Sequence, residues 1–249
     1  MLLEIQHLNF RNGNFSLHDV SLSIPDGSIL GIGGQNGSGK STLLKLMYGF
    51  HKPNSGTIRL DSIPLQSLST REISRKIAVV NQEISDPFNF TALDVVKLSG
   101  YSRTDDDITP ENALETCGIT HLSNRVFSEL SGGEKRLVTI AAAIYQDARI
   151  ILMDEPTAFL DVDKEYTVRK IIHNLREKGK TIVLVLHDIN MLNSVCSHVV
   201  LLKDGGVIAC GTTDEVLVLE NLENAYSVKF RILEDAGPYK FAPAEKYFR

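Results

Sequence analysis

Apolar positions along the chain follow two periods, one typical of strands and one typical of helices. Residues 2–10 and 15–24 alternate apolar and polar side chains like exposed strands, which predicts an antiparallel layer. Helical stretches separate short apolar runs that have the length and β-branched content of buried parallel strands. These runs are 28–32, 77–80, 150–153, 181–186 and 199–202. Alternating strands and helices predict an α/β core with a parallel sheet.

The pattern changes between about residue 84 and residue 147. The apolar runs give way there to helix-like segments at 93–98, 110–117 and 134–145. This change predicts a helical subdomain inserted into a single domain that spans 1–236. Residues 237–249, with two prolines and scattered aromatic side chains, are predicted to form a loosely packed tail.

Composition narrows the class of protein. The chain has 43% hydrophobic and 23% charged residues and a net charge of −5, so it reads as a globular protein without nucleic acid as its main partner. No stretch resembles a signal peptide or approaches about 18 apolar residues, so any membrane association is expected to come through a partner.

Cys117, Cys196 and Cys210 lack C-x-x-C spacing and read as reduced, buried thiols of a cytosolic protein. The run Asp105, Asp106 and Asp107 reads as a solvated loop, because adjacent acids cannot converge on one ion.

A phosphate-binding motif lies between the first buried strand and a helix at 41–47. The run from Gly34 to Thr42 satisfies G-x-x-x-x-G-K-[ST], so backbone N–H groups are expected to surround phosphate oxygens. Lys40 would supply charge to the β- and γ-phosphates, and the hydroxyl of Ser41 would ligate Mg²⁺. The expected ATP contacts are Gly34, Asn36, Gly37, Ser38, Gly39, Lys40, Ser41 and Thr42.

Two acids follow the strand at 150–153. Asp154 would sit at the ligand edge of a parallel sheet and hold Mg²⁺, usually through water. Glu155 would polarise the attacking water as a general base. Adjacent acids after a strand are common, so this prediction depends on the phosphate-binding motif.

The segment Leu130–Glu134 reads Leu-Ser-Gly-Gly-Glu and resembles the signature motif of the ATP-binding cassette (ABC) family. Gln82 matches that family's Q-loop, 158–161 its D-loop, and His187 its switch histidine. The resemblance implies a P-loop NTPase core in which Lys40, Glu155 and His187 act in ATP hydrolysis. It also implies that Gln82 contacts nucleotide and Mg²⁺ beside Ser41 and Asp154.

A dimer is a further implication of the resemblance. In this family the signature loop of one copy covers the γ-phosphate bound by a second copy, arranged head to tail. Ser131, Gly132 and Gly133 would then form a second anion cradle at a helix N-terminus.

Several positions depart from the family pattern. Glu134 replaces the commoner Gln, and Leu137 and Ala142 stand where many members carry arginine. Asn12 precedes Gly13, so Phe15 or Phe10 would have to supply the ring that stacks on adenine, with core packing expected for at least one. Phe15 is the candidate adenine contact.

The segments 91–96, 100–103, 155–161, 187–190 and 224–228 resemble the importer subgroup for ferric siderophores, haem and cobalamin. The implied partners are a second copy of the chain, transmembrane permease subunits and, indirectly, an extracytoplasmic substrate-binding protein. The implied location is peripheral, on the cytoplasmic face of the cell membrane.

Two alternatives remain at this point. An exporter ATPase shares every catalytic motif. A soluble, non-transport cassette, for example in iron–sulfur assembly, translation or repair, is the other. The sequence has one cassette, which argues against the soluble proteins that carry two cassettes in tandem. It has no long coiled coil between the motifs, which argues against the repair proteins.

Overall fold

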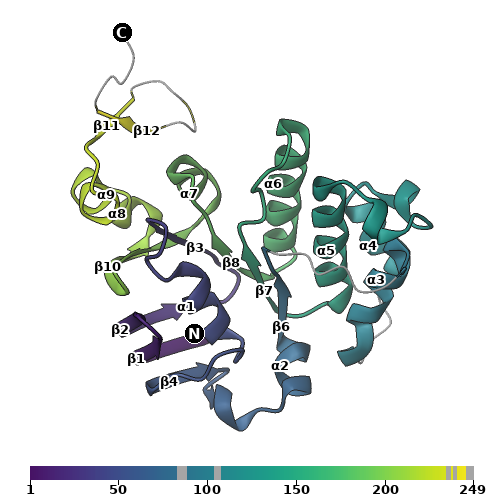
Figure 1. Ribbon diagram of the computed structural model, residues 1–249, viewed down its shortest axis with the longest axis horizontal. Helices are drawn as coiled ribbons and strands as arrows, with labels where there is room; N and C mark the ends of the chain where they lie inside the picture. The colour runs from purple at the N-terminus through teal and green to yellow at the C-terminus, as the bar shows by residue number, and fades with distance from the viewer. Residues whose placement is uncertain (83–88, 104–107, 234–236, 238–239, 245–249) are drawn as a thin grey trace. The chain divides into compact units, whose positions relative to one another are not determined.

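The computed structural model describes residues 1–82, 89–103, 108–233, 237 and 240–244, and it contains two compact units (Figure 1). The first unit consists of residues 1–67 and 183–249, and the second of residues 68–182. The chain returns from the second unit to the first inside strand β8 (Thr181–Val185). The three adjacent aspartates lie outside the described residues.

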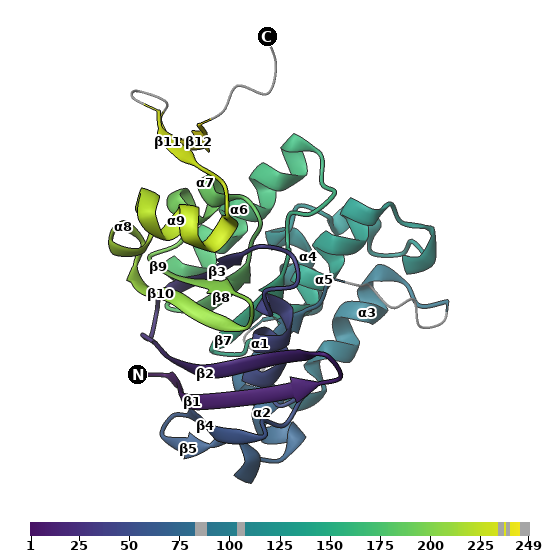
Figure 2. The same ribbon diagram turned by 60° about the vertical axis from the view of Figure 1, so that its left-hand side comes forward.

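An antiparallel sheet opens the first unit. Its strands lie in the order β2 (Phe15–Ile24), β1 (Leu3–Asn12), β4 (Ser55–Leu60) and β5 (Ile63–Pro64), and Figure 2 shows β1 and β2 side by side. Leu3, Ile5 and Leu8 of β1 are buried. The pairing of β1 with β2 shifts register after Ile5, where His7 has a φ of 49°. A bulge at this point turns the strand without breaking the sheet.

Parallel strands form the other sheet of the first unit. β3 (Ile29–Gly34) runs parallel to β9 (His198–Lys203), and β10 (Gly206–Thr212) pairs with β9 in the antiparallel direction. The N–H of Leu186, just after β8, donates to the carbonyl of Ile32 at 3.2 Å. All six residues of β3 are buried. The remaining elements of this unit are α1 (Lys40–Met47), α7 (Ile189–Val195), α8 (Thr213–Val216), α9 (Leu219–Tyr226), β11 (Phe230–Ile232) and β12 (Phe241–Pro243).

In the second unit, β6 (Ile77–Val80) runs parallel to β7 (Ile150–Asp154). The other regular elements are α2 (Thr70–Lys76), α3 (Ala92–Ser99), α4 (Pro110–Thr116), α5 (Gly132–Gln146) and α6 (Val162–Glu177). Figure 1 shows α3, α4 and α5 side by side, in the stretch predicted to be helical. Short 3₁₀ turns occupy 100–102, 120–122 and 127–129 of this unit, and another occupies 65–67 of the first unit. The helices α2 to α5 each begin with a capping box, headed by Ser69, Thr91, Thr109 and Ser131.

The α/β class is therefore confirmed, and the predicted strands fall within a few residues of the observed ones. Two expectations differ from the structure. Phe241, in the segment predicted to be loosely packed, is only 4% exposed and belongs to a strand pair. Cys210, predicted to be buried, is exposed on the edge strand β10. Cys117 and Cys196 are buried as predicted, and burial raises the pKa of each thiol to about 12. Among the described residues, no helix combines the length and the apolar character needed to cross a membrane.

Candidate functional site

The phosphate-binding motif forms the turn between β3 and α1 in the first unit. Gly34, Gly37 and Gly39 have φ values of 138°, 80° and 107°, a region that residues with a Cβ rarely adopt. A Cβ at Gly34 would lie 2.2 Å from the carbonyl oxygen of Leu202. The backbone therefore takes this path because glycine occupies these positions.

Two polar side chains of this loop are buried. The ammonium of Lys40 donates to the carbonyl oxygens of Gly34 and Gln35, both at 2.9 Å. Within the described part of the chain, the hydroxyl of Ser38 is buried without a hydrogen-bond partner. A buried hydroxyl left unsatisfied costs about 1–3 kcal/mol, and a phosphate oxygen in the loop would relieve that cost. The loop thus fits the polyanion that its sequence predicts.

The two candidate aromatic residues have different environments. Phe10 is buried, and its ring stacks on His51 with centroids 5.1 Å apart. Phe15 is half-buried and lies against the phosphate loop, because a Cβ at Gly39 would be 2.7 Å from its ring. Core packing accounts for Phe10, as expected for one of the pair. Adenine stacking by Phe15 stays a prediction.

In the second unit, the two acids follow the predicted geometry at the end of β7. Asp154 is buried as the last residue of the strand, and Glu155 follows with a φ of 50°. The amide nitrogen of Gln82 donates to a carboxylate oxygen of Glu155 at 2.8 Å. The structure thus brings together two residues that the sequence analysis assigned separately.

Arg136 is a residue that the sequence analysis missed. Its guanidinium donates to the carbonyl oxygens of Asn81 and, at 2.8 Å, of Gln82, while the residue is only 5% exposed. Burial lowers the pKa of Arg136, and the carboxylates of Asp154 and Glu155 oppose that shift. A signal was present in the sequence, since Arg136 lies at helical spacings from Gly133, Ile140 and Ala143 and is the charged residue on this buried face of the helix.

The signature segment caps helix α5. The N–H of Ser131 donates to the carboxylate of Glu134 at 2.8 Å, and the hydroxyl of Ser131 accepts from the N–H of Glu134 at 3.3 Å. These hydrogen bonds, the backbone one first, lower the pKa of Glu134. Gly132 is exposed, whereas a Cβ at Gly133 would lie 2.6 Å from the side chain of Lys164.

The remaining predicted elements lie on loops. His187 is exposed in the bend between β8 and α7 of the first unit, and Asp188 caps α7 through the N–H of Asn190 at 2.8 Å. In the second unit, Phe159 of the predicted D-loop has a φ of 60° and is fully exposed.

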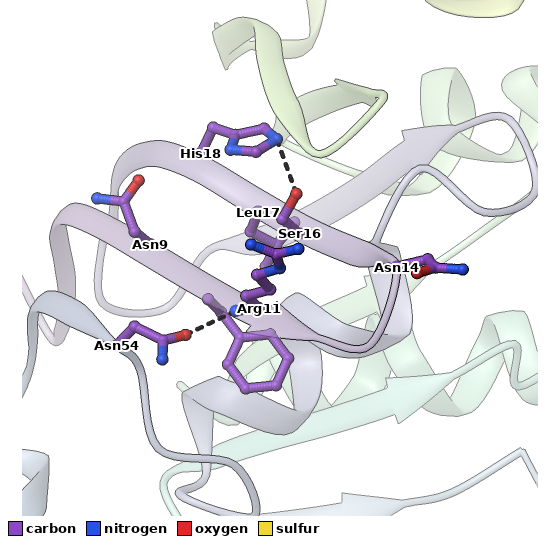
Figure 3. Close-up of a pocket in the computed structure, with 8 residues that line it drawn as sticks. Asn9, Arg11, Asn14, Ser16, Leu17, His18 and Asn54 are labelled. Atoms are coloured by element: carbon purple, nitrogen blue, oxygen red, sulfur yellow. Dashed lines mark hydrogen bonds between the residues drawn. The ribbon is translucent and has the colours of Figure 1, made fainter.

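A separate open pocket of about 440 Å³ lies on the antiparallel sheet (Figure 3). Asn54 accepts a hydrogen bond from the N–H of Arg11 at 2.6 Å, and the side chains of Ser16 and His18 lie 3.0 Å apart. Apart from Phe10, which core packing accounts for, no residue considered as a nucleotide contact lines this pocket. It is therefore not the site that the motifs describe.

Comparison with known proteins decides the family. Residues 17–158 match the model of the ABC transporter family. The chain belongs to the ABC transporter family. It is 31% identical over 240 residues to the ferric enterobactin transport ATP-binding protein FepC of Escherichia coli, covering 92% of this chain and 89% of that protein. It is 35% identical over 247 residues to the hemin import ATP-binding protein HmuV of Bordetella avium, covering 94% and 95%.

A solved structure agrees with these relatives. The ATP-binding cassette MJ0796, solved as a post-hydrolysis dimer bound to ADP and phosphate, is 28% identical with a TM-score of 0.76. The alignment covers 85% of this chain and 99% of that one. The resemblance to the importer subgroup is thus confirmed, and the protein is an ATP-binding subunit that hydrolyses ATP.

Proposed function

We propose that this ATPase powers the uptake of an iron chelate, haem or cobalamin through partner permeases. The phosphate loop supports the ATP-driven part of this proposal most directly, because buried Lys40 and the hydroxyl of Ser38, which has no hydrogen-bond partner among the described residues, fit an ATP polyphosphate. The name of HmuV, a hemin import protein, supports import rather than export, and the name of FepC, a ferric enterobactin transport protein, supports an iron chelate as the substrate.

Each unit carries part of the residues for the proposed chemistry. Lys40 and the loop N–H groups bind the β- and γ-phosphates, and Ser41, Gln82 and Asp154 would hold Mg²⁺. That ion would neutralise charge on the phosphate oxygens. Glu155 accepts the proton of the attacking water, and His187 acts with it in hydrolysis.

A second copy of the chain is the proposed first partner. Ser131 and Gly132 are exposed at the N-terminus of α5, where backbone N–H groups favour an anion. Phe159 and Val162 of the same unit are large apolar side chains that are almost entirely exposed. Exposed apolar side chains in the unit that carries this anion cradle suit burial against a partner that presents bound ATP. The MJ0796 cassette is a dimer in its post-hydrolysis state.

Permease subunits are the second proposed partner. Leu98 and Tyr101, at the end of α3 and in the turn after it, are exposed, and Tyr101 is 82% exposed. Apolar side chains on the helical part of the second unit suit docking to a membrane-embedded partner on the cytoplasmic face. A substrate-binding protein outside the membrane would complete the system.

The test follows both location and uptake. Cells that carry or lack the ATPase are given labelled ferric siderophore, haem and cobalamin, and membrane fractions are compared with and without the permease. We expect uptake of one ligand to require the ATPase, its Lys40→Ala variant to fail, and membrane recovery to require the permease. Unaltered uptake of all three ligands, or recovery of the ATPase in membranes without any permease, would contradict the proposal and favour an exporter ATPase or a soluble cassette.

A further inference from the structure

Tyr226, the last residue of α9, reaches the phosphate loop from the far end of the chain. Its phenol oxygen accepts a hydrogen bond from the N–H of Gly34 at 3.0 Å, across 192 residues of sequence. Its backbone carbonyl also accepts a hydrogen bond from the side-chain amide of Gln35. One residue of the C-terminal segment therefore contacts two consecutive residues of the loop.

The end of β3 is shaped to admit this phenol. A Cβ at Gly33 would lie 3.1 Å from the phenol oxygen and 2.8 Å from methyl groups of Leu192 and Leu201. A side chain at this position would meet all three neighbours. Glycine thus lets the Tyr226 ring approach the backbone closely enough for a hydrogen bond.

Gly34 is held at both of its polar backbone atoms. Tyr226 accepts from its N–H, and the ammonium of Lys40 donates to its carbonyl oxygen at 2.9 Å. An ammonium that moves toward the phosphates of ATP weakens its contact with the carbonyl. The phenol occupies the N–H of Gly34, so this N–H is not expected to contact a phosphate oxygen, and the phenol can hold Gly34 while Lys40 changes partner.

Other residues of the C-terminal segment contact helix α7, which follows the bend that carries His187. Asn190 of α7 donates to the carbonyl of Phe241 at 3.1 Å and accepts from its N–H at 2.9 Å. The Tyr226 ring packs edge-on against Phe230, with centroids 6.0 Å apart. Burial raises the pKa of Tyr226 to about 12; the hydrogen bond from the N–H of Gly34 opposes this shift, and the carboxylate of Asp188 adds to it.

We propose that Tyr226 is a positioning residue that organises the phosphate loop for ATP by holding the N–H of Gly34. The proposal rests on the proposed role of this loop as the ATP site. A loop held in its binding conformation loses less conformational entropy when the ligand arrives. The phenol should therefore strengthen nucleotide binding and leave the chemical step nearly unchanged.

Tyr226→Phe removes the hydroxyl and keeps the ring. One net hydrogen bond corresponds to roughly a threefold to tenfold change in an equilibrium constant, so we expect the Kd values for ATP and ADP to rise by about that factor. The kcat at saturating ATP should stay within about twofold. Hydrogen exchange of the segment 30–37 without nucleotide should become faster. Tyr166→Phe, which alters an exposed tyrosine of α6, is the matched control and should behave like the wild type.

The outcomes separate a positioning role from a structural one. If Tyr226→Phe lowers the unfolding temperature but binds ATP and ADP as tightly as the wild type, the proposal is wrong. Unchanged exchange of 30–37 in this variant would also overturn it. A Lys40→Ala variant that binds ATP normally would instead overturn the role of the loop, and this result is independent of Tyr226.

Discussion

Replacement of Arg136 by methionine tests how the signature helix supports the residues around Glu155. The change keeps an unbranched chain of similar length and removes the guanidinium that donates to the carbonyls of Asn81 and Gln82. Hydrogen bonds from a charged group contribute about 1.5–3 kcal/mol each, and the desolvation of a buried cation offsets part of that sum. The two carbonyls left behind remain without their donor. We expect a net loss of about 2–4 kcal/mol in the free energy of unfolding.

The expected loss is large enough to measure. In a chain of this size, 1 kcal/mol shifts the unfolding temperature by about 2–4 °C, so a loss of about 3 kcal/mol corresponds to about 6–12 °C. Calorimetry without nucleotide gives this shift directly. The kcat for ATP should also fall roughly tenfold or more, because Gln82 would no longer be held beside Glu155.

Two further variants make the test specific. Arg136→Lys keeps the charge, but one ammonium cannot reproduce the planar fork of a guanidinium, so its unfolding temperature should be intermediate. Arg169→Gln breaks a pair with Glu165 on α6, where the two side chains are 2.6 Å apart and both partly exposed. Such a pair contributes about 0.5 kcal/mol or less. An Arg136→Met variant with the stability of Arg169→Gln and wild-type kcat would refute the reasoning.

Three other variants address the site. Glu155→Gln should reduce turnover by about 10²-fold or more and leave ATP binding intact, because the amide cannot accept the water's proton; size exclusion in ATP should reveal a trapped dimer, and wild-type hydrolysis without a dimer would contradict the assignment. Ser131→Arg should bind ATP as a monomer yet fail to dimerise or hydrolyse it, and normal turnover would exclude a composite site. Glu134→Gln should lower the unfolding temperature at pH 7. Folding lowers the pKa of Glu134, so the ionised side chain stabilises the fold fully above the ordinary pKa of 4.5, and this stabilisation is lost as the pH falls through the lowered pKa. The difference in unfolding temperature between the variant and the wild type should therefore vanish in acid. A difference in unfolding temperature that grows as the pH falls would contradict this prediction.

The sequence by itself determined the local structure and the motif residues of this protein. Strand β2 and strand β6 have the predicted bounds, because alternation and continuous apolar runs are properties of short segments. The phosphate loop was predictable for the same reason, since its glycines, Lys40 and Ser41 are contiguous in sequence. The capping box of Ser131 and Glu134 likewise needs only a three-residue separation.

Tertiary structure alone decided the contacts that position those motif residues. The pair Gln82 and Glu155 is separated by 73 residues, and Tyr226 and Gly34 by 192. No local pattern encodes such a distance, because folding brings these segments together through the packing of strands and helices that neither segment specifies alone. Arg136 and Leu137 are neighbours in the sequence, yet one step along a helix turns a side chain by about 100° toward a different environment. The motif residues could therefore be identified from the sequence, whereas the hydrogen bonds that support them could be identified only from the tertiary structure.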